Sequence, residues 1–86
     1  MCTMISLRTP VNGGGKGASG WFPLSQVNIG YDHAAFMRQE HVVLLDFVNP
    51  SINPSARVAV ELDLDSARAL VAQLQETIKA AEESGL

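Results

Sequence analysis

The run His-Val-Val-Leu-Leu-Asp-Phe-Val at residues 41–48 is the feature that most constrains the fold. At the period of two that a strand imposes, Val43, Leu45 and Phe47 form one apolar face. The opposite face, with Val42, Leu44 and Val48, is broken by the single carboxylate of Asp46. A strand that is apolar on both faces is usually covered on both faces. We therefore expect a helix on one face and a second copy of the protein on the other, with Val42, Leu44 and Val48 at a dimer interface.

The C-terminal segment predicts an amphipathic helix over residues 64–83. Apolar side chains recur there at helical spacing and form one stripe, made of Ala67, Leu70, Val71, Leu74 and Ile78. Asp63 occupies the position of an N-cap, Asp65 lies in the first turn, where the helix dipole favours negative charge, and Gly85 ends the helix. We expect the stripe to pack on one face of a sheet.

Three further segments predict strands, at residues 3–11, 27–33 and 57–62. If residues 34–40 close a hairpin, His33 faces His41, and the pairs that follow match in polarity; they are Tyr31 with Val43, Ile29 with Leu45, and Val27 with Phe47. The two Asn-Pro-Ser triplets in residues 49–55 predict a turn. Residues 12–20, with five glycines, predict a flexible surface loop.

These elements predict one α+β domain over residues 1–86: a four-stranded antiparallel sheet in chain order with one C-terminal amphipathic helix packed on one face. A domain of this size buries roughly 60–65% of its unfolded surface, so self-association would stabilise it. The alternative to a homodimer is a monomer whose second sheet face is covered by the glycine-rich loop and Trp21.

Composition argues against two classes of partner. The net charge is −3, and the six Lys and Arg residues are scattered rather than gathered in a basic stripe, so we expect no nucleic-acid partner. No apolar stretch approaches the ~18 residues of a membrane helix, and the N-terminus lacks the pattern of a signal peptide. We therefore expect a cytoplasmic protein with no membrane partner.

Several segments together resemble a family of small actinobacterial proteins of unknown function. They are the Met-Cys-Thr start and the stretches at residues 15–24, 31–33, 40–41, 46–49, 56–62 and 67–70. The run through Gly-Trp-Phe-Pro to Tyr-Asp-His is the most specific of them. The resemblance implies a bacterial source and a free-standing domain, and it implies no activity.

One candidate site is a metal site at the end of the hairpin. His33 and His41, with Glu40 and Cys2 as further candidate ligands, are residue types that bind a divalent transition metal. Asp32 alternates to the opposite face of the strand and is a poor co-ligand. The competing interpretation is that both histidines are solvated edge residues, since no tight metal-binding spacing is present.

The other candidates are weaker. Cys2 would act as an N-terminal nucleophile only if Met1 were removed, and no base partner is evident, so we assign no catalytic residue. The glycine-rich loop lacks the P-loop pattern, although Lys16 in it would supply charge to a ligand. We expect contacts with a ligand or partner at Lys16, Trp21, Tyr31, Phe36 and Met37.

Two functions follow from the sequence. The favoured one is a dimeric accessory or binding module without catalytic activity. The alternative is a metal-binding protein, with or without enzymatic activity, that uses His33 and His41.

Overall fold

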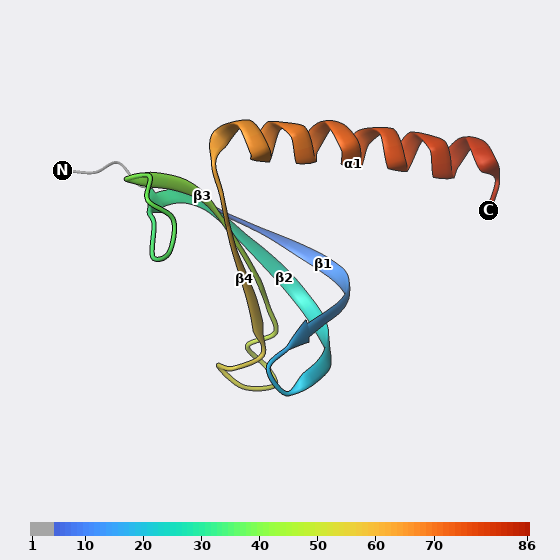
Figure 1. Cartoon of the computed structure of the whole chain (residues 1–86). Helices are drawn as coiled ribbons and strands as arrows, with labels where there is room; N and C mark the ends of the chain where they lie inside the picture. Colours follow the sequence, from blue (N-terminus) through green and yellow to red (C-terminus); the bar gives the residue numbers. More distant parts are fainter. Residues whose placement is uncertain (1–4) are drawn as a thin grey trace.

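The computed structural model describes residues 5–86 and shows a four-stranded antiparallel sheet followed by one long helix (Figure 1). The strands β1 (Ile5–Gly17), β2 (Gly20–His33), β3 (His41–Val48) and β4 (Arg57–Leu62) lie side by side in chain order. The helix α1 spans Leu64–Ser84. The α+β class, the antiparallel sheet in chain order and the C-terminal helix predicted from the sequence are confirmed.

The β2–β3 hairpin has the predicted register, because all four predicted residue pairs, from His33–His41 to Val27–Phe47, lie opposite each other. Alternation along the strands divides the sheet into two faces. The apolar face carries Ile5, Leu7, Val27, Ile29, Tyr31, Val43, Leu45, Phe47, Val58, Val60 and Leu62. The mixed face carries Ser6, Asn28, Asp32, Val42, Leu44, Asp46, Val48, Arg57, Ala59 and Glu61.

The glycine-rich segment is a strand, so the flexible loop predicted for residues 12–20 is wrong. β1 continues to Gly17 and returns into β2 through a turn at residues 18–19. A Cβ on Gly15 would lie 2.9 Å from Leu24 Cδ2, and one on Gly17 would lie 3.5 Å from the carbonyl oxygen of Arg57. A side chain at Gly15 would displace the Leu24 side chain, and one at Gly17 would touch the β4 backbone, so glycine suits this close approach of the segments. The sheet therefore curls, and the β1–β2 tip lies near the start of β4 (Figure 1).

The turn between β3 and β4 forms as predicted from its two Asn-Pro-Ser triplets. The side chains of Asn49 and Asn53 accept hydrogen bonds from the backbone amides of Ser51 and Ser55, at 3.2 and 2.8 Å. These are the local bonds by which asparagine stabilises turns. The Asn49 side chain also donates to the carbonyl oxygen of Pro23 at 2.9 Å, which ties the turn to β2.

The helix α1 begins and ends where the sequence predicts, but the sheet leaves its apolar stripe open. Asp63 caps it by accepting from the Ser66 amide at 2.7 Å, and Gly85 ends it with a left-handed φ of 72°. No residue of α1 is buried, and four apolar side chains of the stripe are 40–56% exposed: Leu70, Val71, Leu74 and Ile78. The predicted packing of the stripe on the sheet is not made within the chain, because only Asp63 separates β4 from α1 and the helix extends away from the sheet (Figure 1).

The core of the single chain is small. Among residues 5–86, only Val27, Val42 and Ala56 are buried apolar side chains. The central strands β2 and β3 keep most of their apolar face half-buried, although such strands usually lie under a second layer. The single chain thus has a sheet and a helix that do not cover each other.

Candidate functional site

The end of the β2–β3 hairpin gathers three groups that can bind a metal ion. His33 ends β2 and His41 begins β3, so the register places them opposite each other. Their ring centroids are 4.6 Å apart, and the His41 ring also stacks on Tyr31 at 5.7 Å. His33, Glu40 and His41 each offer one ligand atom, and these three atoms all lie within 4.8 Å of one another. The hairpin therefore brings together three of the four metal ligands predicted from the sequence; Cys2 lies outside the described residues.

The geometry of this cluster suits an open metal site. Ligand atoms that share one ion through bonds of ~2.1 Å lie at most about 4.2 Å apart, so a small side-chain rotation would close the three groups on an ion. His33 and Glu40 are exposed and His41 is half-buried, which leaves room for that rotation. Two imidazoles and one carboxylate are a ligand set for divalent transition metals, with the remaining positions open to water. Asp32 takes no part in the cluster; its carboxylate accepts from the His33 amide at 2.7 Å.

A second feature, which the sequence analysis missed, fixes the hairpin loop at residues 34–40. The Glu61 carboxylate of β4 accepts hydrogen bonds from three successive backbone amides, those of Ala35 (2.6 Å), Phe36 (3.0 Å) and Met37 (2.9 Å). These hydrogen bonds, from Met37 first and then Ala35, lower the pKa of Glu61 below its usual value because they stabilise the ionised form. We call this arrangement the Glu61 latch. No sequence motif predicts the latch, because it depends on the path of the loop.

The latch holds the loop on the mixed face, where the sequence analysis placed the dimer interface. Val42 on that face has no exposed surface, and Leu44 and Val48 are half-buried. Val42 therefore has no surface left in this chain to offer a second copy. The open apolar surface lies instead on the apolar face and along α1.

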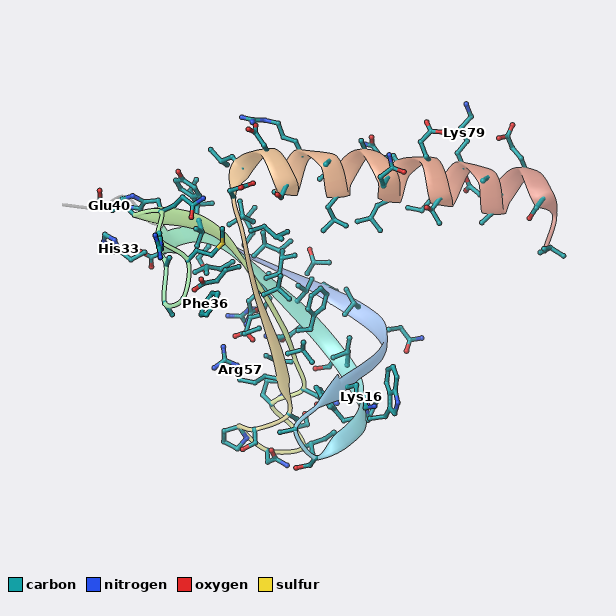
Figure 2. The ribbon with its side chains drawn as sticks, in the orientation of Figure 1. Lys16, His33, Phe36, Glu40, Arg57 and Lys79 are labelled. Atoms are coloured by element: carbon teal, nitrogen blue, oxygen red, sulfur yellow. The ribbon has the colours of Figure 1, made fainter. Side chains whose placement is uncertain are left out.

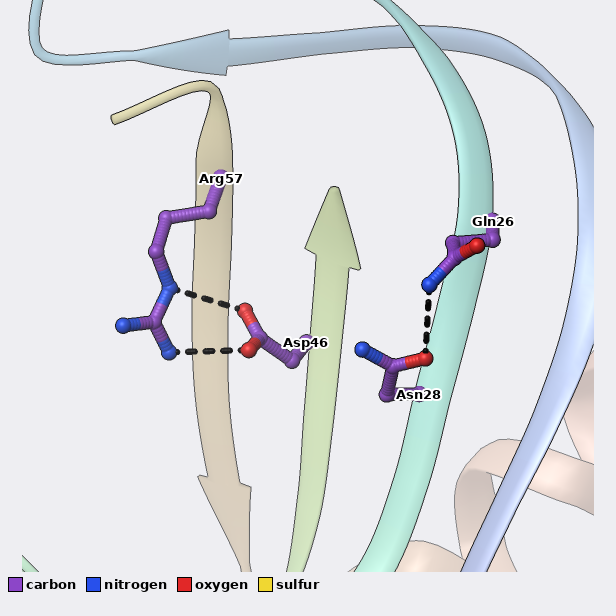
Figure 3. A network of polar contacts seen from close by, with 4 residues as sticks. All are labelled: Gln26, Asn28, Asp46 and Arg57. Carbon is purple, nitrogen blue, oxygen red and sulfur yellow. Dashed lines mark hydrogen bonds and ion pairs between the residues drawn. The ribbon is translucent and has the colours of Figure 1, made fainter. Parts of the chain in front are cut away.

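The mixed face also holds a pocket of about 390 Å³. Leu44 and Ala59 line it, together with Asn28 and the ion pair between Asp46 and Arg57. The Arg57 guanidinium donates to both carboxylate oxygens of Asp46, at 3.0 and 2.9 Å (Figure 3). These two charges satisfy each other, and the carboxylates of Asp32 and Glu61 add acidic groups to the lining.

The remaining predicted contact residues do not meet in one site. Phe36, 92% exposed, lies in the latched loop beside the half-buried Met37. Trp21 is 74% exposed and pairs with Lys16 on the β1–β2 tip. Trp21 therefore does not cover a sheet face, as the monomer alternative required. Of these five residues, Tyr31 is the one that contacts the candidate metal site, because its ring stacks on that of His41.

Comparison with known proteins gives a family and no activity. No helix in residues 5–86 is long and apolar enough to cross a membrane. Neither the curated proteins nor the solved structures contain a significant match to the chain. One family model, described as a family of unknown function, matches residues 1–86, in agreement with the resemblance to a family without an assigned activity. The chain therefore belongs to the family of unknown function DUF6295.

Proposed function

We propose that the protein is a homodimeric binding module without catalytic activity of its own. The observation that carries this proposal is the open apolar stripe of α1, where Leu70, Val71, Leu74 and Ile78 are each at least 40% exposed. A helix gains most of its stability from packing an apolar face, and an isolated helix is marginal in water. A second copy of the chain is the partner that is always present to cover the stripe.

Two of the three carboxylates that line the pocket are already engaged, which favours binding over catalysis. The Glu61 carboxylate is occupied by three backbone amides, and Asp46 is occupied by Arg57. A general acid or base must be within hydrogen-bond reach of a substrate proton. The Glu61 carboxylate is bound to the loop and the Asp46 carboxylate to Arg57 of β4, so neither is free to exchange a proton with a substrate.

The oligomeric state tests the dimer directly. Light scattering coupled to size-exclusion chromatography should give twice the chain mass of 9.2 kDa at micromolar concentration. Leu74→Glu places a charge in the stripe and should give the single-chain mass. Ala69→Glu adds the same charge to the opposite side of the helix and should leave the dimer intact. A wild-type protein that elutes as a monomer would contradict the proposal.

A second function, binding of a divalent transition metal, is favoured by the cluster of His33, Glu40 and His41, whose ligand atoms lie within 4.8 Å of one another. The chain has two histidines, and both belong to this cluster. Elemental analysis of protein purified without an affinity tag decides whether a stoichiometric metal is present.

A further inference from the structure

Two apolar surfaces of the chain lack a cover, and they belong to different elements. One is the stripe of α1, and the other is the apolar face of the sheet, where Ile5 and Leu7 are 52% and 63% exposed. Figure 2 shows α1 extending on the side of the sheet opposite to Arg57, which belongs to the mixed face. The helix therefore projects from the apolar side of the sheet without lying on it.

The exposed area is larger than a compact chain of this mass would have. The accessible surface is 6706 Å², whereas area scaling gives about 4,900 Å² for a folded monomer of this size. Residues 1–4 can account for at most about 700 Å² of this difference, which is the area that four residues expose in a fully extended chain. An excess of about 1,000 Å² or more per chain therefore remains for a partner to cover.

This excess agrees with the size of a permanent dimer interface. Two chains would bury about 2,000 Å² or more together, which falls in the range of obligate homodimers. The radius of gyration gives the same indication, since it is 14.6 Å against about 12 Å for a compact domain of this length.

The connection between β4 and α1 argues against a helix that folds back on its own sheet. Asp63 alone joins Leu62 to Leu64, in an extended conformation with φ −73° and ψ 167°. Its side chain is already used to cap the helix. A helix that returned over its own sheet would need a longer link or would lose this cap. Short connections of this kind favour exchange of the element between two chains.

The shape of the stripe argues for a sheet rather than a second helix as its partner. Leu70 and Val71 stand side by side with Leu74 and Ile78, so the stripe has the broad face of a helix that packs on a core. A coiled-coil seam can be drawn from Ala67 through Val71, Leu74 and Ile78 to Ala81, but it leaves Leu70 at its margin, so the stripe is wider than such a seam uses. Pairing two helices would also leave the apolar face of both sheets open.

We infer that α1 of each protomer packs its apolar stripe on the apolar face of the partner's sheet, in a reciprocal two-fold dimer. This inference rests on the proposed dimer and adds its interface. Each sheet gains the second layer that a two-layer domain requires. The charged side of the helix stays in water; Lys79, for example, points away from the sheet (Figure 2).

Nuclear magnetic resonance on a mixed dimer, in which half of the chains carry ¹³C-labelled methyl groups, tests the interface. Isotope-filtered spectra should show contacts between chains from the Leu74 methyls to those of Leu45 and Val60. If the contacts between chains join helix to helix alone, the inference is wrong and the dimer of the proposed function stands. If the protein is a monomer, both are wrong.

A pair of edge-strand variants gives an independent test. Leu7→Glu charges the apolar face at an exposed position, and it should raise the dimer dissociation constant at least tenfold. Ser6→Glu adds the same charge one residue earlier, on the mixed face, and should leave that constant unchanged. Both residues are exposed in the single chain, so neither change opens its core. A Leu7→Glu protein that dimerises as tightly as the wild type would overturn the reciprocal interface.

Discussion

His33 and His41 face each other across the β2–β3 hairpin with ring centroids 4.6 Å apart. Because these are the two histidines of the chain, one hairpin register gathers every imidazole at a single point. Glu40 adds a carboxylate from the last residue of the loop. The same loop is held at residues 35–37 by Glu61, so the latch and the histidine cluster share one segment.

The histidine cluster should hold one divalent transition metal per chain, measured by elemental analysis of untagged protein. His41→Ala should lower the affinity by more than about tenfold, since loss of a hydrogen-bond partner behind a ligand already costs 10–100-fold. Affinity should also fall as the medium is acidified, because a bound imidazole must give up its proton. Glu82→Gln removes an exposed carboxylate of α1 and serves as the control. Absence of metal from the wild type, or unchanged metal content in a His33→Ala, His41→Ala double variant, would end the hypothesis.

The Glu61 latch should open in acid. Since the hydrogen bonds hold the pKa of Glu61 below its usual value of 4.5, the stabilisation they provide is complete above that value. It is lost as the pH falls through the lowered pKa of the folded state. Hydrogen exchange at the amides of Ala35, Phe36 and Met37 should therefore show weaker protection, corrected for the intrinsic rate, as the pH drops below about 4.5.

Glu61→Gln should have the same effect at neutral pH, because the neutral amide offers one acceptor oxygen in place of two charged ones. Protection of the three loop amides should fall, while that of the β2–β3 ladder stays. Glu76→Gln, which neutralises an exposed carboxylate on α1, should change neither. Equal protection of the loop in Glu61→Gln and wild type would show that the carboxylate does not hold it.

The ion pair between Asp46 and Arg57 should contribute little to stability. The Arg57 side chain is 52% exposed and that of Asp46 is 28% exposed, so we expect a coupling energy of about 0.5–1 kcal/mol, reduced by salt. A double-mutant cycle with Asp46→Asn and Arg57→Gln measures it through urea unfolding at one protein concentration. The pair of Asp65 and Arg68 on α1, more exposed at 95% and 70%, should couple more weakly. A coupling above about 2 kcal/mol would show that the pair is effectively desolvated.

The sequence predicted the features that depend on local spacing. The register of β2 and β3 followed from matching polarity across the hairpin, from His33–His41 to Val27–Phe47. Asp63 and Gly85 mark the helix ends because a cap depends on two or three neighbouring residues. The histidine cluster follows from the same register, with Glu40 next to His41 in the chain.

The features that the sequence did not predict depend on contacts between distant segments. The glycines of β1 suggest a loop by composition, whereas Gly15 and Gly17 lie in a strand that passes close to Leu24 and the backbone of Arg57. In the Glu61 latch, the carboxylate binds backbone amides that lie 24 to 26 positions earlier in the chain, and no sequence motif marks this pairing. An amphipathic pattern shows that α1 needs a partner, but it does not say whether that partner is its own sheet or another chain.

Gly30 should tolerate a side chain poorly, because the backbone of the neighbouring strand lies close to it. A Cβ at this position would lie 2.9 Å from the carbonyl oxygen of Ile5, which belongs to the backbone of β1 and is paired to β2. Gly30→Ala must push the two strands apart, so we expect a loss of about 1–3 kcal/mol in the free energy of unfolding. Gly13→Ala is the control, since no atom lies within 4 Å of a Cβ there. Urea unfolding at one protein concentration should separate the two variants, and equal stabilities would show that β1 shifts without cost.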